Sequence, residues 1–223
     1  LFPSARILRL DRDTTSRRGA LEAALLAAEH GEVDLLVGTQ MLAKGHTFPK
    51  LTLVGILGAD QGLKIPDFRA AERTFQLLTQ VAGRAGRADR PGRVILQTYA
   101  PDHPAIAHAV NQDFEGFAAT ELPYREALAY PPCAALALYR AESEDPRQAK
   151  EALESIKARL GRVAGLRLLG PMEAPVARLK DRWRFQLLVK SPRREAIGEA
   201  LGLAPPPPGG GLRLDRDPQS FSV

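Results

Sequence analysis

Three side chains near the middle of the chain have the types and spacing of an anion-binding site. Gln80, Arg84 and Arg87 fall at i, i+4 and i+7 within the string QVAGRAGR. In a helix these positions share one face, so all three side chains would point at one target. Two guanidinium groups approach each other readily only with an anion between them, and a nucleoside triphosphate supplies one. The alternative is a solvated arginine face at the end of a helix.

A second segment, residues 37–49 with the sequence VGTQMLAKGHTFP, agrees with that interpretation. It follows an apolar run, residues 33–37, which predicts a buried strand. The strand would enter a Gly-Thr turn and a short helix that must end before Pro49, because proline cannot continue a helix. Hydroxyl and backbone N–H groups at such a turn suit a phosphate.

The two segments resemble motifs V and VI of superfamily 2 helicases, in the expected order within one RecA-like motor lobe. The longer strings VGTQMLAKGHTFP, IPDFRAAERTFQLLTQVAGRAGR and GRVILQTYAPDHP resemble one family more closely. This is the PriA family of bacterial replication-restart helicases, also called primosomal protein N′. The resemblance continues through YPPCAALAL and LGPMEAPVARLKDRWRFQLLVKS, so it covers nearly the whole chain.

The resemblance implies catalytic roles for the three spaced side chains. Arg87 matches the arginine finger that meets the developing γ-phosphate charge, and Arg84 lies beside it. Gln80 matches the position that helps to organise the γ-phosphate and the attacking water. ATP and Mg would be bound mainly by a first lobe outside this chain, so the chain alone is predicted to be inactive.

Motif V gives a second set of expected contacts. By resemblance, Thr39 would donate to a DNA phosphate, and Lys44 with Gly45 would lie at the nucleotide cleft. Where DEAD-box relatives carry an acid that holds the ribose, this chain has Thr47.

The sequence lacks a Walker-type phosphate-binding loop and a cysteine cluster. The chain has 223 residues, begins with Leu1 and contains no Walker-type GxxxxGK[ST] loop. Its one cysteine, Cys133, excludes a disulfide within the chain and a thiolate metal cluster, and fits a reducing cytoplasm. PriA-like proteins carry a cysteine-rich zinc insertion just upstream of the position matched by Leu1. We therefore expect zinc in the parent protein and no metal site in this chain.

Composition favours a globular protein with an anionic partner. The chain is 44% hydrophobic and 26% charged, its formal net charge is +5, and no apolar run is long enough to span a membrane. Short apolar strands alternate with helices over residues 1–110, which predicts a parallel sheet covered on both faces. One predicted helix is Ala/Leu-rich and ends at Gly31; another covers about 67–86 and contains motif VI.

The rest of the chain predicts a connector and a second domain. Residues 111–130 are expected to be a helical connector that closes at consecutive prolines. Residues 131–223 have the predicted order βαββαβ, with a helix starting at Pro146, which suggests a ferredoxin-like α+β sandwich. The family resemblance agrees, because the C-terminal domain of PriA is similar to ribosomal protein S10.

Residues 178–194 are strongly basic and are predicted to bind DNA. On a strand, alternate residues point to opposite faces, so Arg182 and Arg184 would share one face while Trp183 and Phe185 face the core. A solvated basic face is the alternative. The DNA-binding candidates in this stretch are Arg178, Lys180, Arg182, Arg184 and Lys190.

The string PDFRAAER lies between motifs V and VI. Asp67 is predicted to cap a helix, and Arg69 or Arg73 could couple DNA to ATP. A purely structural role for these three is the alternative.

The resemblance implies the C-terminal part of an ATP-dependent 3′→5′ DNA helicase that recognises stalled or repaired forks and starts primosome assembly. Its partners would be branched and single-stranded DNA, other primosomal proteins and the acidic tail of the single-stranded DNA-binding protein. The alternative is a non-hydrolysing DNA-binding scaffold that keeps the lobe as architecture, since the Walker motifs lie outside this chain.

Overall fold

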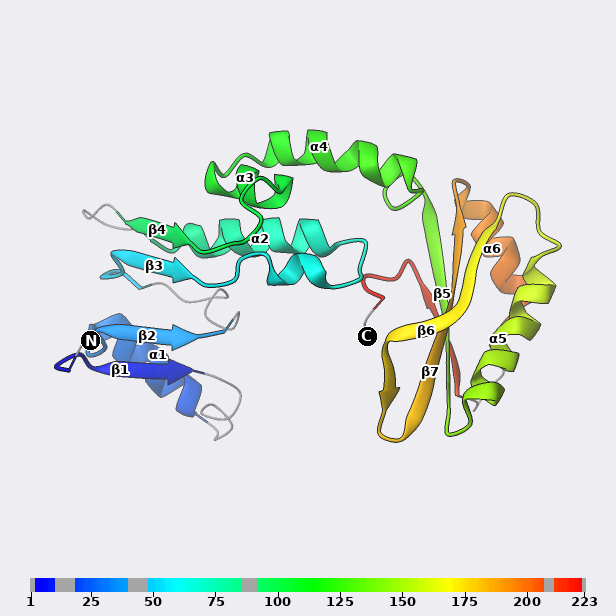
Figure 1. The fold of residues 1–223 in the computed structure, drawn as a ribbon, viewed down its shortest axis with the longest axis horizontal. Coiled ribbons are helices and arrows are strands. Elements are labelled where there is room, and N and C mark those ends of the chain that lie inside the picture. Colours follow the sequence, from blue (N-terminus) through cyan, green and yellow to red (C-terminus); the bar gives the residue numbers. More distant parts are fainter. Residues whose placement is uncertain (1–2, 11–18, 40–47, 86–91, 207–210, 222–223) are drawn as a thin grey trace. The chain divides into compact units, whose positions relative to one another are not determined.

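The chain forms two compact units. The computed structural model describes residues 3–10, 19–39, 48–85, 92–206 and 211–221 (Figure 1). The N-terminal unit comprises Leu1–Leu63 and Ala71–Phe114, and the C-terminal unit comprises Lys64–Ala70 and Glu115–Val223. The domain limits 1–110, 111–130 and 131–223 stay a prediction; the compact units assign residues 64–70 to the C-terminal unit.

The N-terminal unit is built from short parallel strands and helices. Strands β1 and β2 pair in parallel, and so do β3 and β4. This pairing is of the kind predicted for residues 1–110. The elements are β1 (Ile7–Leu10), α1 (Ala20–His30), β2 (Leu35–Gly38), β3 (Leu53–Ile56), the 3₁₀ turn η2 (Gln61–Lys64), α2 (Ala70–Ala82), β4 (Arg93–Leu96) and α3 (Pro104–Val110).

Helix α1 forms where the Ala/Leu-rich run predicts it. It buries Leu25 against Leu10 and Phe48. It ends at Gly31, which has φ 78° and donates its backbone N–H to the carbonyls of Ala27 and Ala28. Glycine adopts this left-handed conformation without the steric cost that a Cβ would add. The predicted glycine stop is confirmed.

The C-terminal unit contains one four-stranded antiparallel sheet and three helices among its described residues. The sheet order is β6-β7-β5-β8, so the first and third strands of the sheet in sequence order lie at its centre. The order of elements after α4 is the predicted βαββαβ. The elements are α4 (Phe114–Ala127), β5 (Ala135–Ser143), α5 (Pro146–Leu160), β6 (Arg167–Leu179), β7 (Arg182–Ser191), α6 (Arg194–Leu203) and β8 (Leu212–Arg216).

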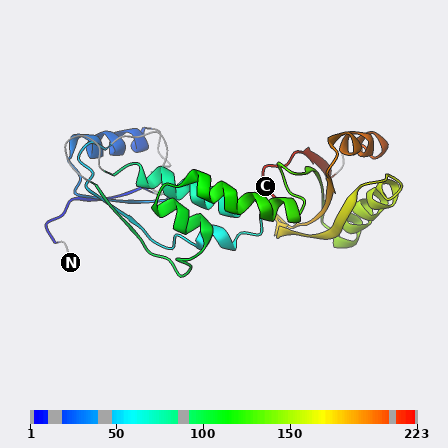
Figure 2. The same cartoon turned by 90° about the horizontal axis from the view of Figure 1, so that it is seen from above.

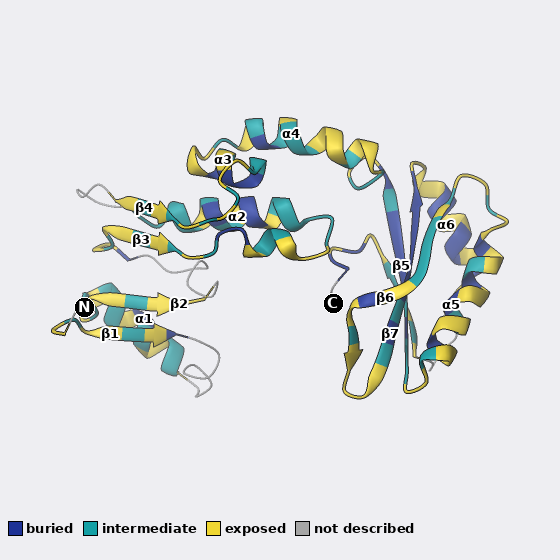
Figure 3. Ribbon diagram, in the orientation of Figure 1, coloured by how far each residue is buried: buried dark blue, intermediate teal, exposed yellow. Residues whose placement is uncertain are grey.

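Helices α5 and α6 cover the same face of this sheet (Figures 1 and 2). Helix α5 begins where predicted: Pro146 occupies the first turn and the Asp145 carboxylate accepts from Arg147 N at 2.9 Å. The core between sheet and helices includes Tyr139 and Leu153, both fully buried. In Figure 3, buried residues lie along β5 and β7, the two central strands of this sheet. The Tyr139 hydroxyl donates to the Ala204 carbonyl at 2.9 Å, so its one buried polar group is satisfied.

The opposite face of the sheet is covered by chain segments rather than by α5 and α6. Leu136, Leu138 and Leu188 on that face pack with Phe221, and Phe68 and Tyr130 pack against the same cluster. Phe68 belongs to the segment just before α2, and Phe221 is the last described residue. The covering segments therefore come from three separate regions of the sequence.

Among the described residues, no helix is long and apolar enough to cross a membrane.

Candidate nucleotide and nucleic-acid sites

Helix α2 presents Gln80 to solvent. The helix buries Thr74, Phe75 and Leu78 on one face, and Gln80 lies on its exposed side near the C-terminal end. The Phe75 ring lies 6.3 Å from the Phe114 ring, centroid to centroid, which fixes the buried face.

Arg84 lies beyond the end of α2, and this corrects the prediction of one continuous helix over 67–86. The α-helix covers Ala70–Ala82, and the next turns are closed by short i→i+3 bonds from Arg84 N to Val81 O and from Ala85 N to Ala82 O. Gly83, exposed at this point, has low helix propensity and favours the tighter turn. Arg84 therefore lies in a turn directly after α2, and Arg87 lies outside the described residues.

Thr39, the candidate DNA contact, lies directly after strand β2. Strand β2 ends at Gly38, and Thr39 follows directly as an exposed residue. Polar groups just after the carboxyl end of a parallel strand lie at the edge where α/β sheets bind ligands. Lys44 and Gly45 lie outside the described residues.

Two contacts that sequence reasoning missed join neighbouring strands, one before β1 and β2 and the other after β3 and β4. Asp34, which precedes β2, receives two hydrogen bonds from the Arg6 guanidinium at 2.8 and 2.9 Å, and Arg6 lowers the pKa of its carboxyl. Asp60, only 4% exposed, accepts from Thr98 Oγ1 and Tyr99 N at 3.2 Å and thereby ties the segment after β3 to the segment after β4. Both pairs join residues far apart in sequence, so no local pattern reveals them.

The basic stretch of the C-terminal unit divides into exposed and buried cations. The Arg178 side chain is 57% exposed and pairs with Asp181 at 3.0 Å, and Lys180 and Arg182 are also exposed. Arg182 donates to the Glu142 carbonyl at 2.9 Å. These three cations lie at or beside the β6–β7 turn, where a phosphate can reach them.

Arg184 and Lys190, by contrast, lie on a covered sheet face, which corrects the prediction that they contact DNA directly. Arg184 is 8% exposed and its Nε lies 3.0 Å from Glu142 Oε1. Lys190 is 3% exposed; its ammonium donates to the Leu128 carbonyl at 3.0 Å and lies 3.3 Å from the Tyr130 ring centroid. A buried charge needs such partners, so neither side chain is available to a phosphate backbone.

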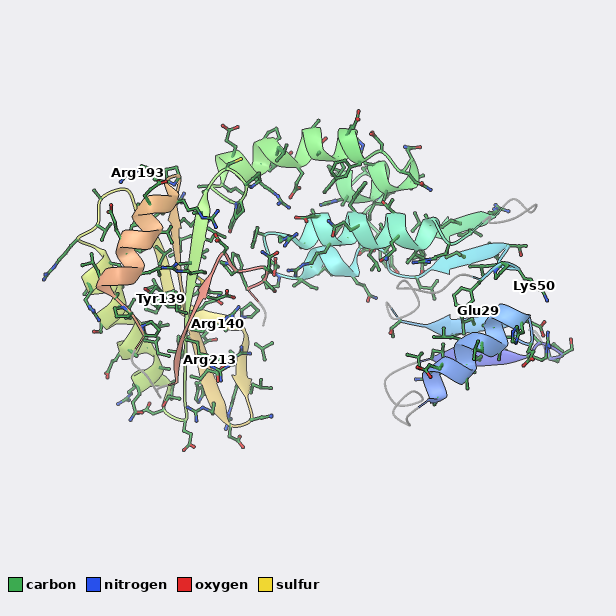
Figure 4. The ribbon with its side chains drawn as sticks, turned by 180° about the vertical axis from the view of Figure 1, so that it is seen from behind. Glu29, Lys50, Tyr139, Arg140, Arg193 and Arg213 are labelled. Carbon is green, nitrogen blue, oxygen red and sulfur yellow. The ribbon has the colours of Figure 1, made fainter. Side chains whose placement is uncertain are left out.

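A cation outside the basic stretch lies on this face too. Arg140 on β5 is opposite Gln186 on β7 and Arg213 on β8. It donates to the Ser220 carbonyl at 2.9 Å, and burial lowers the pKa of its guanidinium, while Asp215 at 3.6 Å acts in the opposite direction. Figure 4 labels Arg140 and Arg213.

The two aromatic residues of β7 have different surroundings. Phe185 packs against the helix-covered core, as predicted. Trp183 is opposite Arg178 on β6, whose guanidinium carbon lies 5.6 Å from the indole centroid. A cation–aromatic pair therefore forms across the hairpin, which alternation along a single strand did not predict.

The described part of the chain contains no group of three or more His, Cys, Asp or Glu side chains that could hold a metal ion, and Cys133 is exposed.

Comparison with known proteins supports both units. Residues 4–89 match the family model described as "Helicase conserved C-terminal domain", which implies a RecA-like lobe. Residues 126–219 match "Primosomal protein N C-terminal domain". The chain belongs to the PriA family. It corresponds to the C-terminal portion of PriA proteins. The helicase domain that it contains is the conserved C-terminal helicase domain.

Individual relatives agree over most of the chain. The "Replication restart protein PriA" of Bacillus subtilis is 50% identical over 205 residues, covering 90% of this chain and 25% of the relative. The PriA proteins of Synechocystis and Haemophilus influenzae are 47% and 43% identical, over 86% and 90% of this chain and 23% and 28% of the relatives. The chain thus spans about a quarter of the length of the PriA relatives it matches.

The environment of Lys190 makes the stability of the C-terminal unit pH-dependent. Burial and the nearby Arg167 lower the Lys190 pKa from 10.5 to about 8. Between these two values the unfolded chain binds more protons than the folded chain, so stability rises with pH. Relative to Lys190→Met, which keeps a long apolar stem, the free energy of unfolding should rise by about 3 kcal/mol between neutral pH and the pKa of an unperturbed lysine.

Urea unfolding of both proteins at several pH values measures this difference. Lys180→Met removes a lysine at the exposed turn and is the matched control for the loss of one positive charge. A flat difference for Lys190→Met would contradict the lowered pKa.

Proposed function

We propose that this chain supplies the second motor lobe and a DNA-binding domain to an ATP-dependent, superfamily 2 DNA helicase. The observation that carries the proposal is the motif VI string, which starts on the exposed side of α2 at Gln80 and lies within the matched helicase domain. In the parent, the lobe would close on ATP and Mg held mainly by the first lobe. The chain alone would be inactive, since its arginines have no nucleotide to act on.

Arg87 would be the finger, Arg84 its neighbour, and Gln80 the group that organises the γ-phosphate and the attacking water. The end of α2 supports this division, because Gln80 lies within the helix whereas Arg84 lies in the turn that follows Gly83. Thr39, exposed after β2, would bind a DNA phosphate, with Lys44 and Gly45 at the cleft.

For the C-terminal unit we propose the ferredoxin-like, S10-like fold. The antiparallel order β8-β5-β7-β6 and the two helices on one face support this proposal. Its exposed cations Arg178, Lys180 and Arg182 would contact the DNA backbone without reading sequence. Arg184 and Lys190 would support the sheet that presents them.

The parent would unwind DNA in the 3′→5′ direction in the cytoplasm, recognise stalled or repaired forks, and start primosome assembly with other primosomal proteins. The names of the relatives support this function, since they are called replication restart proteins. Zinc would be bound by the parent outside this chain.

Arg87→Ala in the complete parent tests the motor function. It should lower DNA-stimulated kcat by roughly 10³ while leaving DNA affinity nearly intact, because it removes transition-state charge rather than a DNA contact. Steady-state ATP turnover and DNA titration measure the two effects. Arg162→Ala, an exposed arginine in the C-terminal unit, is the control and should retain full turnover.

Unchanged turnover in an active parent would show that Arg87 is not the finger. A parent with no ATP turnover would favour the non-hydrolysing scaffold instead.

The salt dependence of DNA binding tests the exposed cations. In this chain, Arg178→Ala with Arg182→Ala should flatten the slope of log affinity against log salt by about one unit for each phosphate that is no longer bound. The matched control is Arg147→Ala with Lys150→Ala on α5, which removes the same charge from the helical face. An equal change in both double variants would leave only non-specific attraction by net charge.

We also propose that the C-terminal unit binds the acidic tail of the single-stranded DNA-binding protein, which ends in phenylalanine with a free carboxylate. Leu122 and Tyr124, 44% and 63% exposed on α4, are available as apolar contacts together with Pro123, Pro131 and Pro132. The Arg125 side chain is only 11% exposed and pairs with Glu121, so an exposed arginine of residues 178–194 is the better partner for the carboxylate.

Titration of this chain with the tail peptide should show that removing its terminal phenylalanine weakens binding about tenfold or more, because the ring is lost and the terminal carboxylate moves back by one residue. Equal affinity for the full and truncated peptides would leave only attraction of acid to base.

A further inference from the structure

The segment just before α2 is fastened to the end of the chain. Asp67 Oδ2 accepts from the Ser220 hydroxyl at 2.7 Å and from the Phe221 backbone N–H at 3.0 Å. Asp67 Oδ1 accepts from Arg69 N at 2.9 Å, one residue before α2 begins at Ala70. One carboxylate thus joins the beginning of the motif VI helix to the C-terminal segment.

Aromatic packing surrounds this carboxylate. The Phe68 ring lies 5.3 Å from the Tyr130 ring and 5.1 Å from the Phe221 ring, centroid to centroid, and Tyr130 lies 6.2 Å from Phe221. Ser220 and Phe221 are each only 9% exposed. We call Asp67, Phe68, Tyr130, Ser220 and Phe221 the tail junction. Partial burial strengthens its charge-assisted hydrogen bonds.

The tail junction is also connected to the sheet face that carries Arg140, Arg184 and Arg213, here called the basic sheet face. The Ser220 carbonyl accepts from Arg140 Nη2 at 2.9 Å, while its hydroxyl donates to Asp67. Arg140 in turn interacts electrostatically with Arg213 and Arg184. A phosphate that approaches exposed Arg213 would alter the field at Arg140, and in a partly buried site such changes are weakly screened.

We propose that Asp67 is a positioning residue through which the basic sheet face controls helix α2, and hence the setting of Gln80 and the arginines that follow it. The connection runs from Arg140 to Ser220, from Ser220 to Asp67, and from Asp67 along the chain into α2. This inference rests on the proposed motor function and assigns it a route from DNA to ATP turnover.

Covering the apolar end of the sheet does not by itself require this carboxylate. Phe68, Tyr130 and Phe221 already bury Leu136 and Leu188. The carboxylate adds directional hydrogen bonds to this apolar packing. It accepts from a side chain and a backbone amide of the C-terminal segment, and also from the backbone of the turn before α2. The carboxylate therefore links the C-terminal segment to the residues that lead directly into α2.

Asp67→Asn in the complete parent separates the two halves of the contact. The oxygen of the new amide can still accept from Arg69 N. The NH₂ group of the amide then faces the Phe221 N–H, and two donors cannot form a hydrogen bond with each other. Ser220→Ala removes the hydroxyl from the other side, and Ser220→Thr restores it. Both Asp67→Asn and Ser220→Ala should lower DNA-stimulated kcat about tenfold, with KM for ATP, DNA affinity and DNA-independent turnover within about twofold.

Two further variants distinguish positioning from general stability. Asp145→Ala removes the carboxylate at the start of α5 in the same unit, and should lower stability without lowering stimulation. The double variant Asp67→Asn with Ser220→Ala should be no worse than Asp67→Asn alone, because both act through one contact. Full stimulation in Asp67→Asn, while Arg87→Ala abolishes turnover, would overturn the proposal and leave the motor function standing.

Hydrogen exchange in the 223-residue chain tests the contact of Asp67 with the C-terminal segment independently of ATP turnover. Asp67→Asn should speed exchange of the Phe221 amide and of the first turn of α2 severalfold, with β5 unchanged, whereas Asp145→Ala should not affect either site. Unchanged exchange in Asp67→Asn would overturn the contact itself. If Arg87→Ala has no effect on turnover, both the motor function and the proposed control of α2 by the basic sheet face are wrong. Hydrogen exchange then still shows whether the tail junction forms.

Discussion

A four-stranded sheet with apolar residues on both faces must be covered on both, and this constraint organises the C-terminal unit. Helices α5 and α6 bury one face around Tyr139 and Leu153. On the other face, the side chains of Leu136, Leu138 and Leu188 are covered by segments recruited from elsewhere in the sequence. At about 25 cal/mol per Å² of apolar surface removed from water, an uncovered cluster of this kind would cost several kcal/mol.

The same constraint explains why the basic stretch can be only partly interpreted from sequence. Alternation along residues 182–190 correctly places Phe185 in the helix-covered core, because alternation is a property of one strand. Exposure depends on what lies beside and above the strand. Since β7 lies between β5 and β6 and its second face is covered, Arg184 and Lys190 find partners in Glu142 and Leu128 instead of solvent. The candidate cations that remain exposed are those at the β6–β7 turn.

Local signals predict most elements of the N-terminal unit and fail where geometry is set by distant residues. The stop of α1 at Gly31 follows from glycine's conformational freedom, and is predictable. The predicted end of α2, at about residue 86, is too late, since the helix ends at Ala82. The helical spacing of Gln80, Arg84 and Arg87 favours a longer helix, whereas the low helix propensity of Gly83 favours the observed end. Asp60 cannot be recognised at all: its partners, Thr98 and Tyr99, follow a strand distant in sequence, and nothing local distinguishes it from other acids.

The assignment of residues 64–70 shows how tertiary contacts can override sequence order in defining a unit. These residues lie between two motor motifs, yet Phe68 finds its burial against Tyr130 and Phe221. A single aromatic side chain buries about 150–250 Å² in typical proteins, which outweighs the weak preferences of a short connecting segment. The chain must then leave this unit through α2, the helix that leads into motif VI. The segment just before that helix is therefore attached to the covered sheet face in two ways, by the aromatic packing of Phe68 and by the hydrogen bonds of the Asp67 carboxylate.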